Sequence, residues 1–240
     1  MRTLENVCLA FLLTAAYVPE TANPGATAST NVFESYRALL GCRTFLAFAL
    51  TATGAHAGFH IFAAGAPSVL IGTFNVRPEA YGLYATLPPM GFLLGSFLSN
   101  RLTSRFELNQ LIAIGGGILI SGGISIVAFA VWGYATPVSI VGPMVVICCG
   151  SGLVTPNAVA GGIGAKPEAA GAASGLLSFM QIAGAAGATT VASFCDSASP
   201  LTLALLIASV GGIAMLAFAG LAHRVHPSQR GSLGKLRTPR

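Results

Sequence analysis

The sequence predicts an all-α integral membrane protein whose hydrophobic helices form a six-helix bundle. Only 8% of its 240 residues are charged and 54% are hydrophobic, whereas charged residues make up roughly 25% of an ordinary soluble domain. The chain also holds 30 glycines, and small residues are typical of helices that pack closely inside a bilayer. Because so few charges cannot cover a soluble surface, lipid is the expected solvent.

The bundle follows from the stretches of sequence that carry no charge, since a helix needs ~20 mostly apolar residues to cross the hydrocarbon core. The longest stretch, 108–165, exceeds one helix and is interrupted at 132–137 by turn formers and interfacial aromatic residues. Strands of a membrane barrel would alternate in polarity instead of remaining apolar. The expected helices are 45–71, 80–100, 109–132, 137–163, 171–193 and 200–222.

Prolines lie inside several of these expected helices. Pro67 and Pro156 should each produce a kink, because proline has no N–H to donate within a helix. Pro88 and Pro89 should act in the same way near the start of the second helix.

Basic residues collect on one side of the expected membrane. When the loops are assigned alternately to the two sides, ten Lys and Arg residues fall on one side and only Arg77 and Arg2 on the other. Cytoplasmic loops are enriched in Lys and Arg, so we expect a multi-pass protein of the plasma or inner membrane with a cytoplasmic carboxyl terminus. The ten residues are Arg37, Arg43, Arg101, Arg105, Lys166, Arg224, Arg230, Lys235, Arg237 and Arg240.

The beginning of the chain allows two interpretations. Its apolar run could be a signal peptide with a cleavage site at 26–28, or the end of a preceding membrane helix. A signal peptide would export the arginines that follow, so the charge distribution favours the second interpretation. We therefore expect a partial transmembrane helix at 1–18, a cytoplasmic connector at 19–44, the bundle at 45–222 and a cytoplasmic basic tail at 223–240.

Composition and motifs argue against several function classes. Five basic residues cluster in the tail and not along a helix face, so nucleic acid is not an expected partner. The five cysteines have no Cys-x-x-Cys spacing, and we expect neither disulfides nor a metal site. Without a phosphate loop, a Ser/His/Asp set or paired carboxylates, the chain is expected to be neither an ATP-driven pump nor an enzyme.

Several segments resemble a known transporter family. The segment 91–105 resembles the Gly-x4-Asp/Asn-Arg-x3-Arg loop that the major facilitator superfamily repeats in each half. The segments 156–160 and 170–181 are similar to the Pro-Asn-Ala and Ala-Gly-x-Ala-Ser patterns in the second half of its drug-exporting Bcr/CflA branch. Residues 19–21 resemble the Pro-Glu-Thr exit from that family's sixth helix.

This resemblance covers nearly the whole chain but corresponds only to the carboxyl-terminal half of the family's fold. The chain departs from the pattern at Gly175 and Ser178, where both residues remain small. The resemblance implies half of a proton-coupled efflux antiporter for a hydrophobic or cationic small molecule, driven by the proton gradient without a cofactor. Such transporters place their site between two six-helix halves, so the implied partner is a separate amino-terminal half or a second copy.

Two histidines occupy the middle of the first expected helix. His56 and His60 are four residues apart and therefore share a helical face. Ionisable residues within a membrane usually face a cavity or a partner, and imidazole changes charge near neutral pH, which suggests substrate binding or proton movement. Hydrogen bonding of neutral histidines between helices is the structural alternative.

Two amides are further candidates for a substrate cavity. Asn157 lies at an expected kink, and Gln181 lies on the next helix. Either could line a polar cavity or form a hydrogen bond between helices. The small residues that share their helical faces are Gly150, Gly161 and Gly164 for Asn157, and Gly171, Ser174 and Ser178 for Gln181.

A candidate gating loop follows the second expected helix. Gly95, Asn100, Arg101 and Arg105 fit the family's loop, which closes the cytoplasmic side through charge contacts with a neighbouring helix end. Asn100 replaces the carboxylate of the stricter motif, and Glu107 could partly substitute for it. Anchoring by positive charge alone is the structural alternative.

Glycine pairs four residues apart are expected to be helix-packing contacts. These pairs are Gly54/Gly58, Gly91/Gly95 and Gly171/Gly175.

Two functions remain open at this point. The first is half of an efflux transporter, and the second is a non-transporting membrane fragment or a helix-packing scaffold. An intramembrane enzyme is a distant third.

Overall fold

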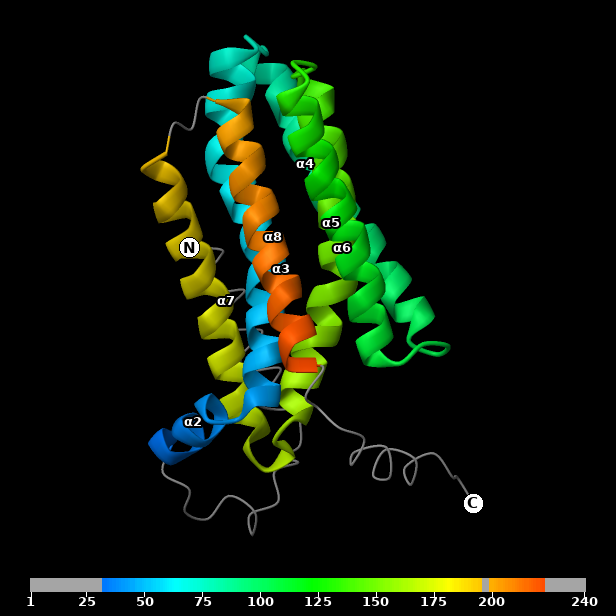
Figure 1. Cartoon of the computed structure of the whole chain (residues 1–240), viewed down its shortest axis with the longest axis vertical. Coiled ribbons are helices and arrows are strands. Elements are labelled where there is room, and N and C mark those ends of the chain that lie inside the picture. Colours follow the sequence, from blue (N-terminus) through cyan, green and yellow to red (C-terminus); the bar gives the residue numbers. More distant parts are fainter. Residues whose placement is uncertain (1–31, 196–198, 223–240) are drawn as a thin grey trace, which may run out of the picture.

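The structure is a computed structural model that describes residues 32–195 and 199–222. In these ranges the chain is helical apart from short connections, and no strand occurs (Figure 1). The expected partial helix at 1–18 and the basic tail at 223–240 lie outside the described residues. The elements are α2 (Val32–Leu40), α3 (Arg43–Pro67), the π-helical segment η1 (Ser68–Thr73), α4 (Pro78–Leu102), α5 (Leu108–Val131), α6 (Pro137–Gly164), the 3-10 turn η2 (Pro167–Ala169), α7 (Ala170–Ser193) and α8 (Pro200–Ala222).

Five of the described helical segments are long and apolar enough to cross a bilayer, which indicates a multi-pass membrane protein. They correspond to α3 with η1, α5, α6, α7 with η2, and α8. The sequence predicts six such helices. The one that is not among these candidate spans is α4, although it has 25 residues. Its apolar character is reduced by Glu79 and Arg101 near its ends and by Pro88 and Pro89 within it.

When α3 is counted together with η1, the ends of the long helices lie within about two residues of the predicted bounds, a margin usual for helix termini. At Pro67 the α-helix gives way to the π-helical segment η1, so the expected irregularity is present there. α6 continues without interruption through Pro143 and Pro156, and α4 continues through its two prolines.

The contacts between helices divide α3–α8 into two similar groups of three. α3 and α6 pack against each other, α4 packs on α6 while α7 packs on α3, and α5 packs on α6 while α8 packs on α3. Exchanging the group α3–α5 with the group α6–α8 therefore reproduces this set of contacts. Successive long helices run in opposite directions (Figure 1), so α3 and α6 are antiparallel and the two groups have the relation of an inverted repeat.

Glycine allows two of these helix pairs to approach closely. A Cβ added to Gly91 or Gly95 of α4 would meet the backbone of α6 at Val145 or Cys149. On the other side of the bundle, a Cβ added to Gly54 of α3 would lie 3.2 Å from the Val210 carbonyl oxygen of α8 and closer still to the Ala214 side chain. The predicted packing role of the glycines on α3 and α4 is confirmed at these positions.

The third glycine pair has a different environment. Nothing lies within 4 Å of a Cβ added to Gly171, and the Tyr36 hydroxyl, at 3.8 Å, is the one atom within that distance at Gly175. The prediction of a close helix contact at this pair was wrong, because both glycines lie on an exposed face of α7. Tyr36, the neighbour of Gly175, belongs to α2, a helix that the sequence did not predict within the connector.

Candidate functional site

His56 and His60 form a paired arrangement on α3. Their ring centroids are 4.7 Å apart and the rings are tilted by 51°, while His60 Nδ1 lies 3.3 Å from the His56 carbonyl oxygen. Both side chains are half-buried. Within residues 32–195 and 199–222 neither ring has a hydrogen bond to another helix, so each retains ring nitrogen capacity for a ligand or a proton.

The histidine pair lies on a face of α3 that is covered before the pair and open beyond it, although other faces of α3 remain buried there, as at Ile61 and Phe62. Before the pair, Phe45 and Ala49 are fully buried against α7 and α2. Beyond it, Ala63 and Ala64 are exposed. An imidazole pair at this boundary is positioned to contact molecules that reach the open part of the face.

Asn157 lies inside the bundle, at the contact between α6 and α4. Its Nδ2 donates hydrogen bonds to Ser99 Oγ and to the Leu153 carbonyl oxygen, both at 2.7 Å, and the residue is 6% exposed. The structure thus places Asn157 in an interhelical hydrogen bond, the structural alternative of the two that the sequence left open.

The proline beside Asn157 has a local consequence at the same contact. Pro156 cannot donate a backbone hydrogen bond to residue 152, so the Gly152 carbonyl oxygen has no helical partner. The Ser96 hydroxyl of α4 lies 3.4 Å from that oxygen and donates to it. Ser96, Ser99, Gly152 and Asn157 together form a polar contact between α4 and α6, and sequence reasoning missed both serines because nothing in α4 marks them.

Gln181 lies on α7, where small and polar residues form an exposed stripe. Gly171, Ser174 and Ser178 are exposed and Gln181 is half-buried. Neither serine hydroxyl nor the Gln181 amide has a hydrogen bond to the described part of the chain. Unpaired polar groups are costly on a lipid-facing helix surface, so this stripe is suited to a water-filled cavity or to a second protein surface.

The candidate gating loop joins α4 to α5. Gly95 packs against the α6 backbone, while Asn100, Arg101 and Arg105 are exposed. The Arg101 guanidinium lies over the Phe97 ring at 5.1 Å from its centroid, a distance typical of a cation–π contact.

Glu107 does not supply the missing carboxylate of this loop. Its side chain accepts from the backbone of Gln110, and the Gln110 side chain accepts from the Glu107 N–H at 3.0 Å, so it forms a capping box at the start of α5. The suggestion that Glu107 compensates for Asn100 therefore has no support in the geometry. Among the described residues neither Arg101 nor Arg105 forms an ion pair.

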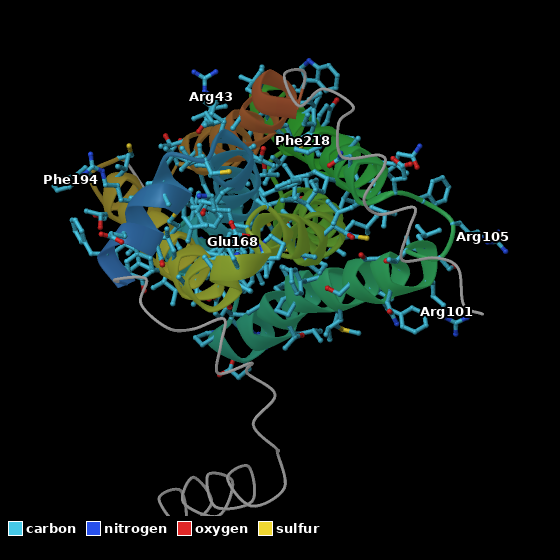
Figure 2. The ribbon with its side chains drawn as sticks, turned by 90° about the horizontal axis from the view of Figure 1, so that it is seen from below. Arg43, Arg101, Arg105, Glu168, Phe194 and Phe218 are labelled. Carbon is cyan, nitrogen blue, oxygen red and sulfur yellow. The ribbon has the colours of Figure 1, made fainter. Side chains whose placement is uncertain are left out.

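Most described charges lie at one end of the bundle. Arg43 begins α3, Arg101 ends α4, and Lys166 lies between α6 and α7. Figure 2, a view from below, shows Arg43, Arg101 and Arg105 around the rim of this end. At the opposite end the described basic residue is Arg77.

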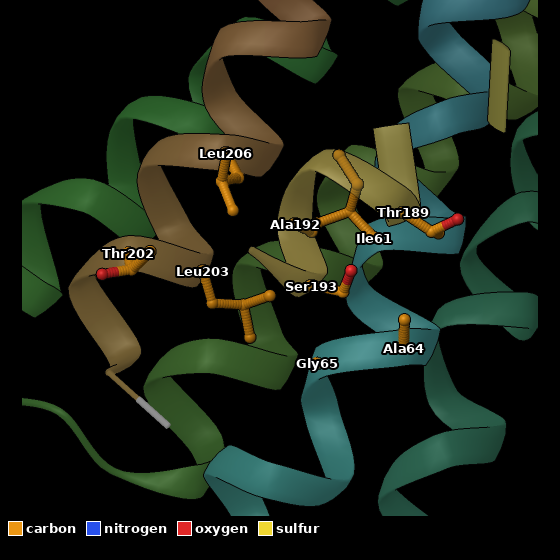
Figure 3. A pocket seen from close by; sticks show the side chains of 9 residues that line it. All are labelled: Ile61, Ala64, Gly65, Thr189, Ala192, Ser193, Thr202, Leu203 and Leu206. Carbon is orange, nitrogen blue, oxygen red and sulfur yellow. The ribbon is translucent and has the colours of Figure 1, made fainter. Parts of the chain in front are cut away.

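Two cavities are unsuited to a drug-sized substrate. A cavity of about 70 Å³ lies between α3, α7 and α8 (Figure 3), well below the ~300–1,000 Å³ of ordinary ligand pockets. A groove of about 820 Å³ between α5 and α8 is lined by apolar residues such as Ile124, Val131 and Met215. Its lining is almost entirely apolar and offers few of the polar groups that orient a substrate.

Among the described residues, two buried hydroxyls lack hydrogen-bond partners. Thr53 Oγ1 on α3 and Thr155 Oγ1 on α6 have no hydrogen bond, whereas the nearby Ser151 hydroxyl donates to the Ala55 carbonyl oxygen at 2.8 Å. Within the described chain, no three His, Cys, Asp or Glu side chains form a group that could hold a metal ion.

No protein-family model matches the chain, and no curated protein matches it significantly.

Proposed function

We propose that α3–α8 all cross the membrane and form one half of a proton-coupled transporter for a hydrophobic or cationic small molecule. The observation that carries this proposal is the division of the bundle into two inverted groups of three helices. Inverted repeats of this kind are a common architecture of secondary transporters, whose substrate sites lie near the middle of the bilayer between repeats or halves.

The distribution of polar groups supports the same proposal. Within the membrane-spanning part, the His56–His60 pair and the exposed stripe on α7 lack hydrogen bonds to other helices. A second bundle that covered both the histidine pair and the stripe would enclose a polar path, which accounts for groups that lipid would solvate poorly. In this proposal His56 and His60 contact substrate or carry protons, and Gln181 contributes to the cavity.

Charge supports an orientation for the bundle. The end that carries Arg43, Arg101, Arg105 and Lys166 faces the cytoplasm in this proposal, and the end with Arg77 faces outward. The carboxyl terminus then lies in the cytoplasm of a cell whose plasma or inner membrane holds the protein. The resemblance of 156–160 and 170–181 to the Bcr/CflA branch adds the substrate class and the proton gradient as energy source.

Water access to the proposed face tests the proposal. Single cysteines would be introduced by His60→Cys and Ser178→Cys in a chain whose native cysteines are replaced by alanine. Ile124→Cys is the matched control, because Ile124 is 65% exposed on the apolar surface of α5. In membranes, a charged methanethiosulfonate reagent should modify the first two positions at least tenfold faster than position 124. Equally slow modification at all three would place the face in lipid and refute the proposal.

A further inference from the structure

α2 is an ordered element to which the transport proposal assigns no role. It lies across the end of the bundle where α3 and α7 begin (Figure 1), and only Gly41 and Cys42 separate it from α3. Leu39 of α2 is fully buried. It belongs to an apolar cluster with Phe45, Ala49, Ala173 and Leu177. This packing fixes the position of α2 on the bundle.

Apolar side chains of α2 are nevertheless exposed on one face. Phe33 is 77% exposed, Tyr36 36% and Leu40 50%, and their spacing of three and four residues places them on the same side of the helix. Glu34 lies away from this face, whereas Arg37 follows Phe33 by four residues and borders the apolar face. In water this arrangement would leave a concentrated apolar surface uncovered.

The depth of α2 relative to the bilayer follows from the helix that it precedes. The continuous segment Arg43–Thr73 has 31 residues and is therefore about 46 Å long at 1.5 Å per residue. The hydrocarbon core is ~30 Å thick and the bilayer with its headgroups ~40–45 Å. Arg43, at the start of this segment, thus lies at the level of the lipid headgroups, and α2 lies beside it.

We propose that α2 is an interfacial helix that binds the surface of an anionic bilayer. Phe33, Tyr36 and Leu40 enter the boundary between headgroups and acyl chains, as the apolar faces of amphipathic surface helices do. Arg37 and Arg43 are exposed, form no ion pair with the described residues, and provide positive charge complementary to anionic phospholipid headgroups. This inference needs only a membrane-spanning bundle, so it stands or falls independently of transport.

Tryptophan quenching tests this placement, because Trp132 is the one tryptophan of the chain. In a Trp132→Phe background, Phe33→Trp and Leu40→Trp would each place a single indole on the apolar face. Ala38→Trp is the matched control, since Ala38 is exposed on the opposite side of α2. Each full-length variant would be reconstituted into phosphatidylcholine vesicles, with circular dichroism as the check of folding and Tyr36→Trp as a replacement for any variant that fails it.

Lipids with brominated acyl chains should quench the indoles at positions 33 and 40 and leave the one at position 38 nearly unaffected. Iodide, supplied on both sides of the vesicles, should show the reverse order. If iodide quenches all three alike, α2 lies in water and the proposal is wrong. If neither quencher reaches positions 33 and 40, another protein surface covers them, which also overturns it.

The headgroup part of the proposal has its own measurement. Two mixtures of phosphatidylglycerol and phosphatidylcholine are compared, one with bromine on the phosphatidylglycerol and one with bromine on the phosphatidylcholine. The measured quantity is the ratio of the quenching of the indole at position 40 in the first mixture to that in the second. We expect the anionic lipid to be favoured by at least about fivefold, because roughly 1 kcal/mol per arginine near a charged surface corresponds to about fivefold for one arginine and more for the two together. Arg37→Gln combined with Arg43→Gln should bring the ratio close to one. A ratio near one before that substitution would refute the anionic preference.

Discussion

The close contact between α4 and α6 gives the sharpest prediction of stability. α4 packs along α6 and touches α3 and α5 at few points, so its place in the bundle depends on this one seam. Gly95→Ala would bring a Cβ against the Cys149 carbonyl group and within 3.1 Å of the Cys149 Cα. Backbone atoms cannot rotate away as a flexible side chain can, so the two helices must separate or shift.

The magnitude follows from a matched control on the same helix. Gly82 is exposed, and nothing lies within 4 Å of a Cβ added there. Gly82→Ala and Gly95→Ala share the gain in helix propensity, up to about 1 kcal/mol in water, and differ in the overpacking cost of about 1–3 kcal/mol. We therefore expect the free energy of unfolding of Gly95→Ala to be about 1–3 kcal/mol lower than that of Gly82→Ala.

The assay is unfolding of the purified full chain in detergent micelles, followed by circular dichroism during titration with sodium dodecyl sulfate. Gly152→Ala should repeat the loss from the α6 side, since its Cβ would meet the Phe92 carbonyl oxygen. If Gly95→Ala and Gly82→Ala are equally stable, α4 does not pack on α6 in this register.

Further outcomes follow from the polar groups and the topology. Asn157→Leu combined with Ser99→Ala in a double-mutant cycle should give a coupling energy of about 0.6–1.7 kcal/mol in micelle unfolding, and zero coupling would contradict the hydrogen bond. His56→Ala and His60→Ala should leave stability within about 0.5 kcal/mol, because neither imidazole has a hydrogen bond to another helix among the described residues, and a larger loss would show that the pair holds the fold. A cysteine placed at 228–234 should resist an impermeant reagent in intact cells, and rapid labelling there would reverse the proposed orientation.

The sequence predicts the long helices well because chemical signals mark their ends. Pro78 and Pro137 stand at the first position of α4 and α6, where proline is well tolerated, and Glu107 begins α5 with a capping box. α2 carries no comparable signal. Nine residues are too few to register as an apolar span, and the contact that orders them is the tertiary burial of Leu39.

The candidate site was less predictable, because a helical face can be identified without knowing what covers it. Two of the three glycines that share a face with Asn157 contact other helices, since Gly150 lies against α5 and Gly161 against Phe48 of α3, while nothing lies within 4 Å of a Cβ added to Gly164. A face rich in glycine therefore indicated packing and not a cavity. The stripe with Ser174 and Ser178 has the same composition but is exposed, and the difference comes entirely from the positions of neighbouring helices.

Transport by the purified chain in liposomes tests the central claim most directly. The chain would be reconstituted at low density with a fluorescent lipophilic cation trapped inside, and a pH gradient would then be imposed across the membrane. Alternating access requires two bundles that move about a site between them, so the account predicts no proton-dependent efflux from chains that crosslinking shows to be monomeric. Proton-dependent efflux by such monomers would contradict the claim that this bundle supplies only one wall of the path.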